Sequence, residues 1–161
     1  MPLTVLPVDY HNVEHRHALV MLLDAYARDP MGGGEGLAED VMARLCDDLA
    51  ARPDAASFIA WRDGQPVGLV NCIEGYSTFK ARPLMNIHDI AVLPGQRGQG
   101  VGQALLQAAQ DHARARGCCK LTLEVLTGNL VALRSYERFG FAPYALDPAA
   151  GQASFMQKWM D

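Results

Sequence analysis

Apolar residues along this chain recur with a period of two in some segments and near 3.6 in others, and these segments predict the order of strands and helices. Leu3 to Val8 is a short apolar run that predicts a first strand. Two leucine-rich stripes at helical spacing then predict two amphipathic helices. The first stripe contains Leu19, Leu22, Leu23 and Tyr26, and the second contains Leu37, Val41, Leu45 and Leu49. Between them, Met31 to Gly36 contains four glycines and predicts a mobile loop.

After Ser57 the apolar period shortens to that of strands. Phe58 to Trp61 and Val67 to Ile73 flank the dipeptide Asp63-Gly64, which is typical of a tight hairpin turn. We therefore expect an antiparallel hairpin here. The remaining predicted elements are a strand at 85–93, a helix at 100–116, a strand at 120–125, a helix at 129–139 and two last strands at 141–145 and 153–159.

The predicted order is β-α-α-β-β-β-α-β-α-β-β, which gives one mixed sheet with helices on its faces. A chain of 161 residues has the length of one ordinary domain. No internal repeat or linker divides it. We therefore predict one α/β domain with a mixed (α+β) sheet over residues 1–161.

Composition narrows the class of protein. Half of the residues are apolar and 20% are charged, which excludes a disordered chain or a coiled coil. The formal charge of -4 argues against a general binder of nucleic acid or anionic membranes. The chain has no secretory signal and no apolar run long enough to span a membrane, so we expect a cytoplasmic protein.

The histidine and cysteine spacings do not favour a metal site. The four cysteines, Cys46, Cys72, Cys118 and Cys119, lack the paired C-x-x-C spacing of a zinc site. We interpret them as reduced thiols of the core. We expect neither a metal nor nucleophilic thiol chemistry.

The most informative segment is the glycine-rich turn after the strand at 85–93, because it opens a helix. Glycines at alternate positions let backbone N–H groups approach a ligand, and the helix N-terminus adds a partial positive charge. Arg97 adds a forked cation. This pattern favours a phosphate or diphosphate. The residues concerned are Arg97, Gly98, Gln99, Gly100, Val101 and Gly102.

Two other phosphate-binding loops do not match this segment. A P-loop requires a Lys-Ser or Lys-Thr pair after its glycines, and the segment has neither. A dinucleotide-binding loop requires a third glycine where Gln103 stands, and a leading βαβ unit where the sequence predicts a hairpin. The alternative interpretation of this segment is a tight turn that binds no ligand.

The pattern Arg97-x-x-Gly100-x-Gly102 resembles that of the GCN5-related N-acetyltransferase (GNAT) superfamily. A second motif, formed by Asn129, Tyr136 and the run Phe139-Gly140-Phe141, resembles the later helix of that family. The resemblance implies the single-domain acyl-CoA N-acyltransferase fold. In that fold the strands at 86–93 and 120–125 form a central parallel pair that splays apart. The resemblance also implies that acetyl-CoA is the co-substrate and that the glycine turn holds its diphosphate.

The same resemblance implies roles for residues beside the splayed strands. The pantetheine arm pairs with Ala91 and Val92, and the Val92 N–H points at the thioester carbonyl. Asn129 and Tyr136 lie on one helix face, although Asn129 is also a candidate helix cap. Tyr136 is the implied donor of a proton to the leaving thiolate. A core aromatic is the alternative reading of this tyrosine.

A general base is needed, because an alkyl amine is mostly protonated at neutral pH. The sequence leaves several candidates for this base. Strict alternation places Asn86, His88, Ile90 and Val92 on one face of their strand and Ile87, Asp89 and Ala91 on the other. Some relatives carry a glutamate where His88 or Asn86 stands. His88 is the first candidate, because imidazole exchanges protons near neutrality. Asp89, Glu74 and Glu124 stay open as alternatives.

These features predict an acetyl-CoA-dependent N-acetyltransferase. It transfers acetyl directly to the primary amine of a small molecule or peptide, in a ternary complex. The alternative is a catalytically silent acyl-CoA-binding regulatory module, which the missing glutamate on the central strand favours. A partner-binding scaffold with an empty loop is a third reading. The family and the predicted edge strands near residue 161 also suggest a homodimer.

Overall fold

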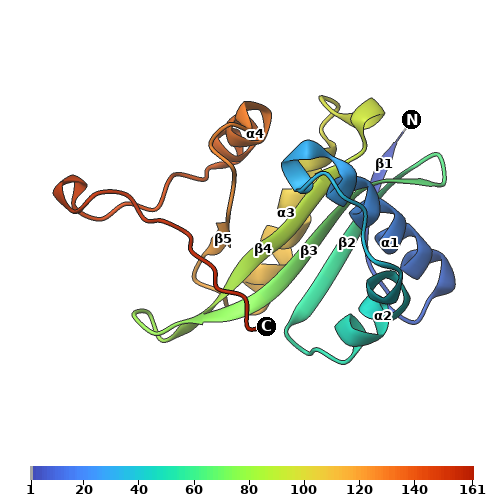
Figure 1. The fold of residues 1–161 in the computed structure, drawn as a ribbon, viewed down its shortest axis with the longest axis horizontal. Helices are drawn as coiled ribbons and strands as arrows, with labels where there is room; N and C mark the ends of the chain where they lie inside the picture. Colours follow the sequence, from blue (N-terminus) through green and yellow to red (C-terminus); the bar gives the residue numbers. More distant parts are fainter. Residues whose placement is uncertain (1) are drawn as a thin grey trace.

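The computed structural model describes residues 2–161, and these form one five-stranded sheet with helices on both faces (Figure 1). The strands lie in the order β1-β2-β3-β4-β5, with antiparallel neighbours except for the parallel pair β4 and β5. The mixed sheet that the sequence predicts is confirmed. The strands are β1 (Leu3–Pro7), β2 (Ala55–Arg62), β3 (Gln65–Ser77), β4 (Arg82–Val92) and β5 (Leu121–Leu123).

The helices divide between the two faces of the sheet. On one face α1 (Val13–Arg28) and α2 (Glu39–Ala50) pack through Leu19, Leu22 and Leu49. The other face carries α3 (Val101–Ala115), and α4 (Leu130–Phe139) contacts α3. Short 3-10 turns occupy Pro30–Gly32, Pro94–Gln96 and Pro148–Ala150, the first of them inside the predicted glycine loop.

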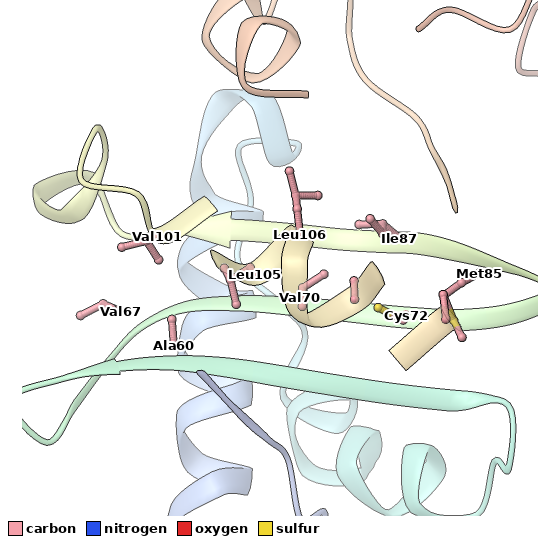
Figure 2. Packing of buried hydrophobic residues seen from close by; sticks show 11 residues of the cluster. Ala60, Val67, Val70, Cys72, Met85, Ile87, Val101, Leu105 and Leu106 are labelled. Atoms are coloured by element: carbon pink, nitrogen blue, oxygen red, sulfur yellow. The ribbon is translucent and has the colours of Figure 1, made fainter. Parts of the chain in front are cut away.

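Helix α3 packs very close to the sheet. Figure 2 shows Val101, Leu105 and Leu106 of α3 among the buried side chains of β3 and β4. At Gly68 of β3 an added Cβ would lie 2.8 Å from Val101 Cγ1 and 3.0 Å from Leu105 Cδ1. Because only glycine leaves this space, the first turn of α3 lies directly on the sheet.

Two of the four cysteines lie in the core as predicted, and the residues that the structure describes contain no disulfide. Cys46 and Cys72 are buried, and Cys118 and Cys119 are half-buried. Burial, with a smaller contribution from the charge of Asp89, raises the pKa of the Cys72 thiol to about 12. Such a thiol is inert at neutral pH.

One expectation about β4 is wrong, because the strand contains a β-bulge. Asn71 of β3 lies opposite Asp89, whereas the next residue, Cys72, lies opposite Ile87. His88 is therefore the extra residue, and a bulge reverses the alternation of side chains beyond it. Ile87 before the bulge and Ile90 after it both pack in the core under α3. Thus His88 and Asp89 share the face of α1 and α2, not opposite faces.

The parallel pair is short, and it leaves most of β4 with an open edge. Only Met85–Ile87 pair with Leu121–Leu123, so the predicted strand at 120–125 is shorter than expected. Beyond Leu123 the chain leaves the sheet and turns toward α4. The predicted splay of the central parallel strands is confirmed, and residues 88–92 have a free edge among the residues that the structure describes.

The two strands predicted at 141–145 and 153–159 do not form. After Phe141 the chain is exposed and has no strand, and Figure 1 shows it making a wide loop beyond α4 and then turning back. Pro143, inside the first of these runs, lacks the N–H that a ladder needs. The run at 153–159 has strand-like composition but no partner strand in the described part of the chain, and a strand cannot exist without one.

Candidate active site

The glycine turn presents free backbone donors at the start of α3. Gly98 and Gly100 have left-handed backbones, with φ of 74° and 83°. Gly100 is the N-cap residue, without a side-chain cap, and the first helical bond runs from the Ala104 N–H to the Gly100 carbonyl. The amides of Val101 and Gly102 thus lack helical partners. This end of α3 suits an anion.

Side chains from other elements fasten this turn. Arg62, at the end of β2, donates from one guanidinium nitrogen to Oε1 of Gln96 and of Gln99, both at 2.7 Å. Gln99 also donates to the Gly95 carbonyl at 3.2 Å. Sequence reasoning missed Arg62, because nothing local connects it to a turn more than 30 residues away.

Arg97 lies against the end of β4. Its Nε donates to the Val92 carbonyl at 3.1 Å, and its terminal nitrogen lies 3.3 Å from Oδ2 of Asp29. The Met31 N–H and, next, Arg97 lower the pKa of Asp29. Arg97 thus ties the turn to β4 and to the end of α1.

The free edge of β4 directs backbone groups toward the gap. The Leu93 N–H donates to the Val67 carbonyl of β3. Because consecutive N–H groups of a strand point to opposite edges, the Val92 N–H points away from β3, toward the open edge. Val92 is half-buried there, as is Ala91. This edge can pair with an extended ligand.

Tyr136 and Asn129 come from α4, on the far side of the gap. The Asn129 side chain accepts the Ala132 N–H at 3.2 Å, which confirms its role as helix cap. Tyr136 packs edge-on against Phe141, and burial, with a smaller contribution from Tyr26, raises the pKa of its phenol to about 12. The phenol is therefore a proton donor over the whole neutral range. Gln103 of α3 holds α4 in place by donating to the Ser135 carbonyl at 2.8 Å.

A pocket of about 470 Å³ lies on the α1 and α2 face of β4. Leucines of both helices form its apolar wall, and β3 and β4 supply polar groups. Exposed His88 has Nδ1 3.3 Å from Oδ1 of Asn86. Half-buried Asp89 accepts from Nδ2 of Asn71 at 3.0 Å. The bulge brings these two titratable side chains to the same pocket.

The other two candidate bases are placed differently. Glu74 also lines the pocket, but its carboxylate forms an ion pair with Arg116, which lies beyond α3. The hydrogen bond from Arg116 lowers the pKa of Glu74, which makes it a weaker base. Glu124 is exposed beyond the end of β5.

Tyr26 of α1 is half-buried. Burial, and next the charges of Asp89 and Asp29, raise the pKa of its phenol.

Within residues 2–161, no group of three or more His, Cys, Asp or Glu side chains is arranged to hold a metal ion. No helix in the same range has the length and apolar character needed to cross a membrane.

Comparisons with known proteins agree with this geometry. Residues 19–141 match the model of the acetyltransferase (GNAT) family. A streptothricin acetyltransferase of Streptomyces lavendulae is 40% identical over 126 residues, which are 78% of this chain and 58% of that protein. The chain spans little more than half of this curated relative and less than half of others.

Two solved structures have the same fold. A probable acetyltransferase superposes with a TM-score of 0.80 at 20% identity, covering 100% of this chain and 99% of that one. An aminoglycoside N-acetyltransferase, AAC(6')-Iy, in complex with CoA has a TM-score of 0.77 at 21% identity, covering 98% and 95%.

Proposed function

The chain belongs to the acetyltransferase (GNAT) family, and we propose that it is an acetyl-CoA-dependent N-acetyltransferase acting on a small-molecule amine. The acetyl group passes directly to the amine in a ternary complex. One observation carries this proposal: the open edge of β4 lies beside the uncapped start of α3, while the adjoining residues of the same strand line a separate pocket. Two substrates can therefore meet at β4.

The residues at the gap fit the coenzyme. The unpartnered amides at 98–102 suit its diphosphate, and the free edge at Ala91 and Val92 suits a pantetheine arm that pairs like a strand. Asn129 and Tyr136 face it from α4. When bound, acetyl-CoA supplies the activated acyl group.

The chain's own groups carry the proton transfers. His88 takes a proton from the ammonium form of the acceptor, whose nitrogen then forms a bond to the acyl carbon. The Val92 N–H donates to the acyl oxygen as charge grows there, a contribution of about 3 kcal/mol for such a donor. As the carbon–sulfur bond breaks, Tyr136 gives its proton to the sulfur, and the second proton of the attacking nitrogen passes to water. Exchange with water restores both side chains.

The test is release of free thiol from acetyl-CoA with a panel of primary amines, together with calorimetry of acetyl-CoA binding. We expect binding, and turnover with at least one amine. Binding without turnover on any amine would instead support the acyl-CoA-binding module. No binding would overturn both functions.

We also propose a homodimer. Phe155, Met156, Trp159 and Met160 of the C-terminal segment are each more than 70% exposed, more apolar surface than a monomer usually leaves in water. Sedimentation should give twice the monomer mass, and replacing Phe155 and Trp159 by Ser should give the monomer. A cytoplasmic location stays a prediction.

A further inference from the structure

Two polar side chains are buried inside the sheet, and they belong to one chain of hydrogen bonds. Ser57 of β2 and Asn71 of β3 are only 3% and 5% exposed. Tyr10 lies 2.8 Å from Ser57, Ser57 lies 2.6 Å from Oδ1 of Asn71, and Nδ2 of Asn71 lies 3.0 Å from Oδ2 of Asp89. Buried polar groups are costly unless they are paired, and every link here is made.

The chemistry of these groups sets the direction of the chain. Asn71 Oδ1 only accepts, so the Ser57 hydroxyl donates to it, and the Tyr10 hydroxyl must then donate to Ser57. A reversed amide at Asn71 would bring its oxygen against the carboxylate of Asp89, two acceptors together. Each donor therefore points toward Asp89.

An amide is neither an acid nor a base near neutrality. Asn71 therefore interrupts any proton path from Ser57 to Asp89. The row of hydrogen bonds orients the carboxylate but does not conduct protons.

The other carboxylate oxygen is available to a ligand. Oδ1 of Asp89 has no hydrogen-bond partner among residues 2–161. Asp89 lines the pocket together with the apolar side chains of Leu23, Leu45 and Leu49, and the guanidinium of Arg52, which also lines it, is paired with Asp54. One free anionic oxygen beside an apolar wall suits an ammonium group on an apolar body.

We propose that Asp89 binds the ammonium group of the acceptor and that Asn71 and Ser57 are positioning residues that hold its carboxylate toward the pocket. The acceptor is therefore a cationic amine with an apolar body. This inference rests on the proposed function insofar as the pocket is the acceptor site. Bound at Asp89, the ammonium lies beside His88, the adjacent residue on the same face.

Calorimetry with benzylammonium chloride tests the anchor without any turnover, and benzyl alcohol is the neutral control. We expect wild type to bind benzylammonium about tenfold or more tightly than benzyl alcohol. Asp89→Asn should remove this preference. Equal binding of both probes by wild type, no binding of benzylammonium, or an unchanged preference in Asp89→Asn would each overturn the cation site.

The positioning role has its own variants. Asn71→Leu keeps the branched shape of the side chain but has no donor, and it should weaken benzylammonium binding about fivefold while benzyl alcohol and acetyl-CoA binding stay unchanged. Ser57→Ala should show a smaller loss, and Ser57→Thr, which keeps the hydroxyl, should restore affinity. If Asn71→Leu fails to fold, the Ser57 pair decides. Wild-type affinity in Ser57→Ala, or no recovery in Ser57→Thr, would overturn the positioning role.

Steady-state kinetics of the same variants distinguish a positioning role from a general loss of structure. With the best amine of the panel, Asn71→Leu should raise KM for the amine and leave KM for acetyl-CoA unchanged. An equal rise in both would count against the inference. If no amine is turned over but benzylammonium binding still follows Asp89 and Asn71, the proposed function fails and the cation site stands.

Discussion

The glycine turn and the pocket on the other side of β4 are built in opposite ways. The turn is continuous in sequence, and its ligand-binding groups are backbone amides, so almost any fold that starts a helix there would present them. The pocket gathers side chains from α1, α2, β3 and β4, and its polar groups meet only because of one strand register. The comparison shows that the proposed coenzyme site is encoded locally, whereas the proposed acceptor site depends on long-range pairing.

The largest effect should come from deleting His88, which removes the proposed base and the bulge together. Asp89 would then follow Ile87 in regular alternation and still lie opposite Asn71. We expect turnover to fall about a hundredfold or more, because a general base is worth that much, while benzylammonium binding persists. Thiol release and calorimetry measure the two quantities. A folded deletion variant that lost benzylammonium binding would contradict this register.

Tyr136→Phe separates chemistry from coenzyme binding. We expect turnover to fall at least about tenfold with acetyl-CoA affinity little changed, because only the proton donor is lost. The raised pKa of Tyr136, about 12, adds a pH test. The acid form is the active one, so wild-type turnover should not decline between about pH 8 and pH 10.5. Wild-type turnover in the variant would exclude the acid role.

Gly100→Val should damage the turn alone. A β-branched residue at φ 83° is strained by about 1–2 kcal/mol, and the strain displaces the first amides of α3. Acetyl-CoA affinity should fall about tenfold, whereas benzylammonium affinity should not change. A loss of both, in a variant with wild-type thermal stability, would mean that the two sites are coupled.

The smallest effect should come from Arg116→Gln, which frees Glu74. Arg116 depresses the pKa of Glu74 in the folded state, so this pair stabilises the fold above the unfolded pKa of about 4.5 and loses that effect as the pH falls. Wild type should melt slightly above the variant at pH 7, and the difference should vanish near pH 3. A clear gain in turnover in the variant would instead support Glu74 as the general base.

Much of the fold can be predicted from apolar periodicity, because each element up to α4 buries one face against a neighbour. The strands predicted at 141–145 and 153–159 were wrong, since a strand requires a partner strand that the local sequence does not reveal. The glycine turn could also be predicted from the sequence, because positive φ and uncapped amides follow from the local residues themselves.

The pocket could be predicted only in part. His88 and Asp89 were candidates, but strict alternation separated them, and only the offset between Asn71 and Cys72 in β3 reveals the bulge. Asn71 and Ser57 carry no motif, and each looks like an ordinary strand residue. One usable signal existed: Asn71 is a polar position within the predicted apolar run Val67 to Ile73.

Gly68 affects the proposed diphosphate site although it is buried where no ligand can contact it. Any larger residue there would press on Val101 and Leu105 and lift the start of α3 from β3. A mutational scan scored for coenzyme affinity should therefore single out position 68, deep in a strand, alongside the turn itself. Variation at such a position would adjust the cofactor preference of this scaffold while every contacting residue stayed the same.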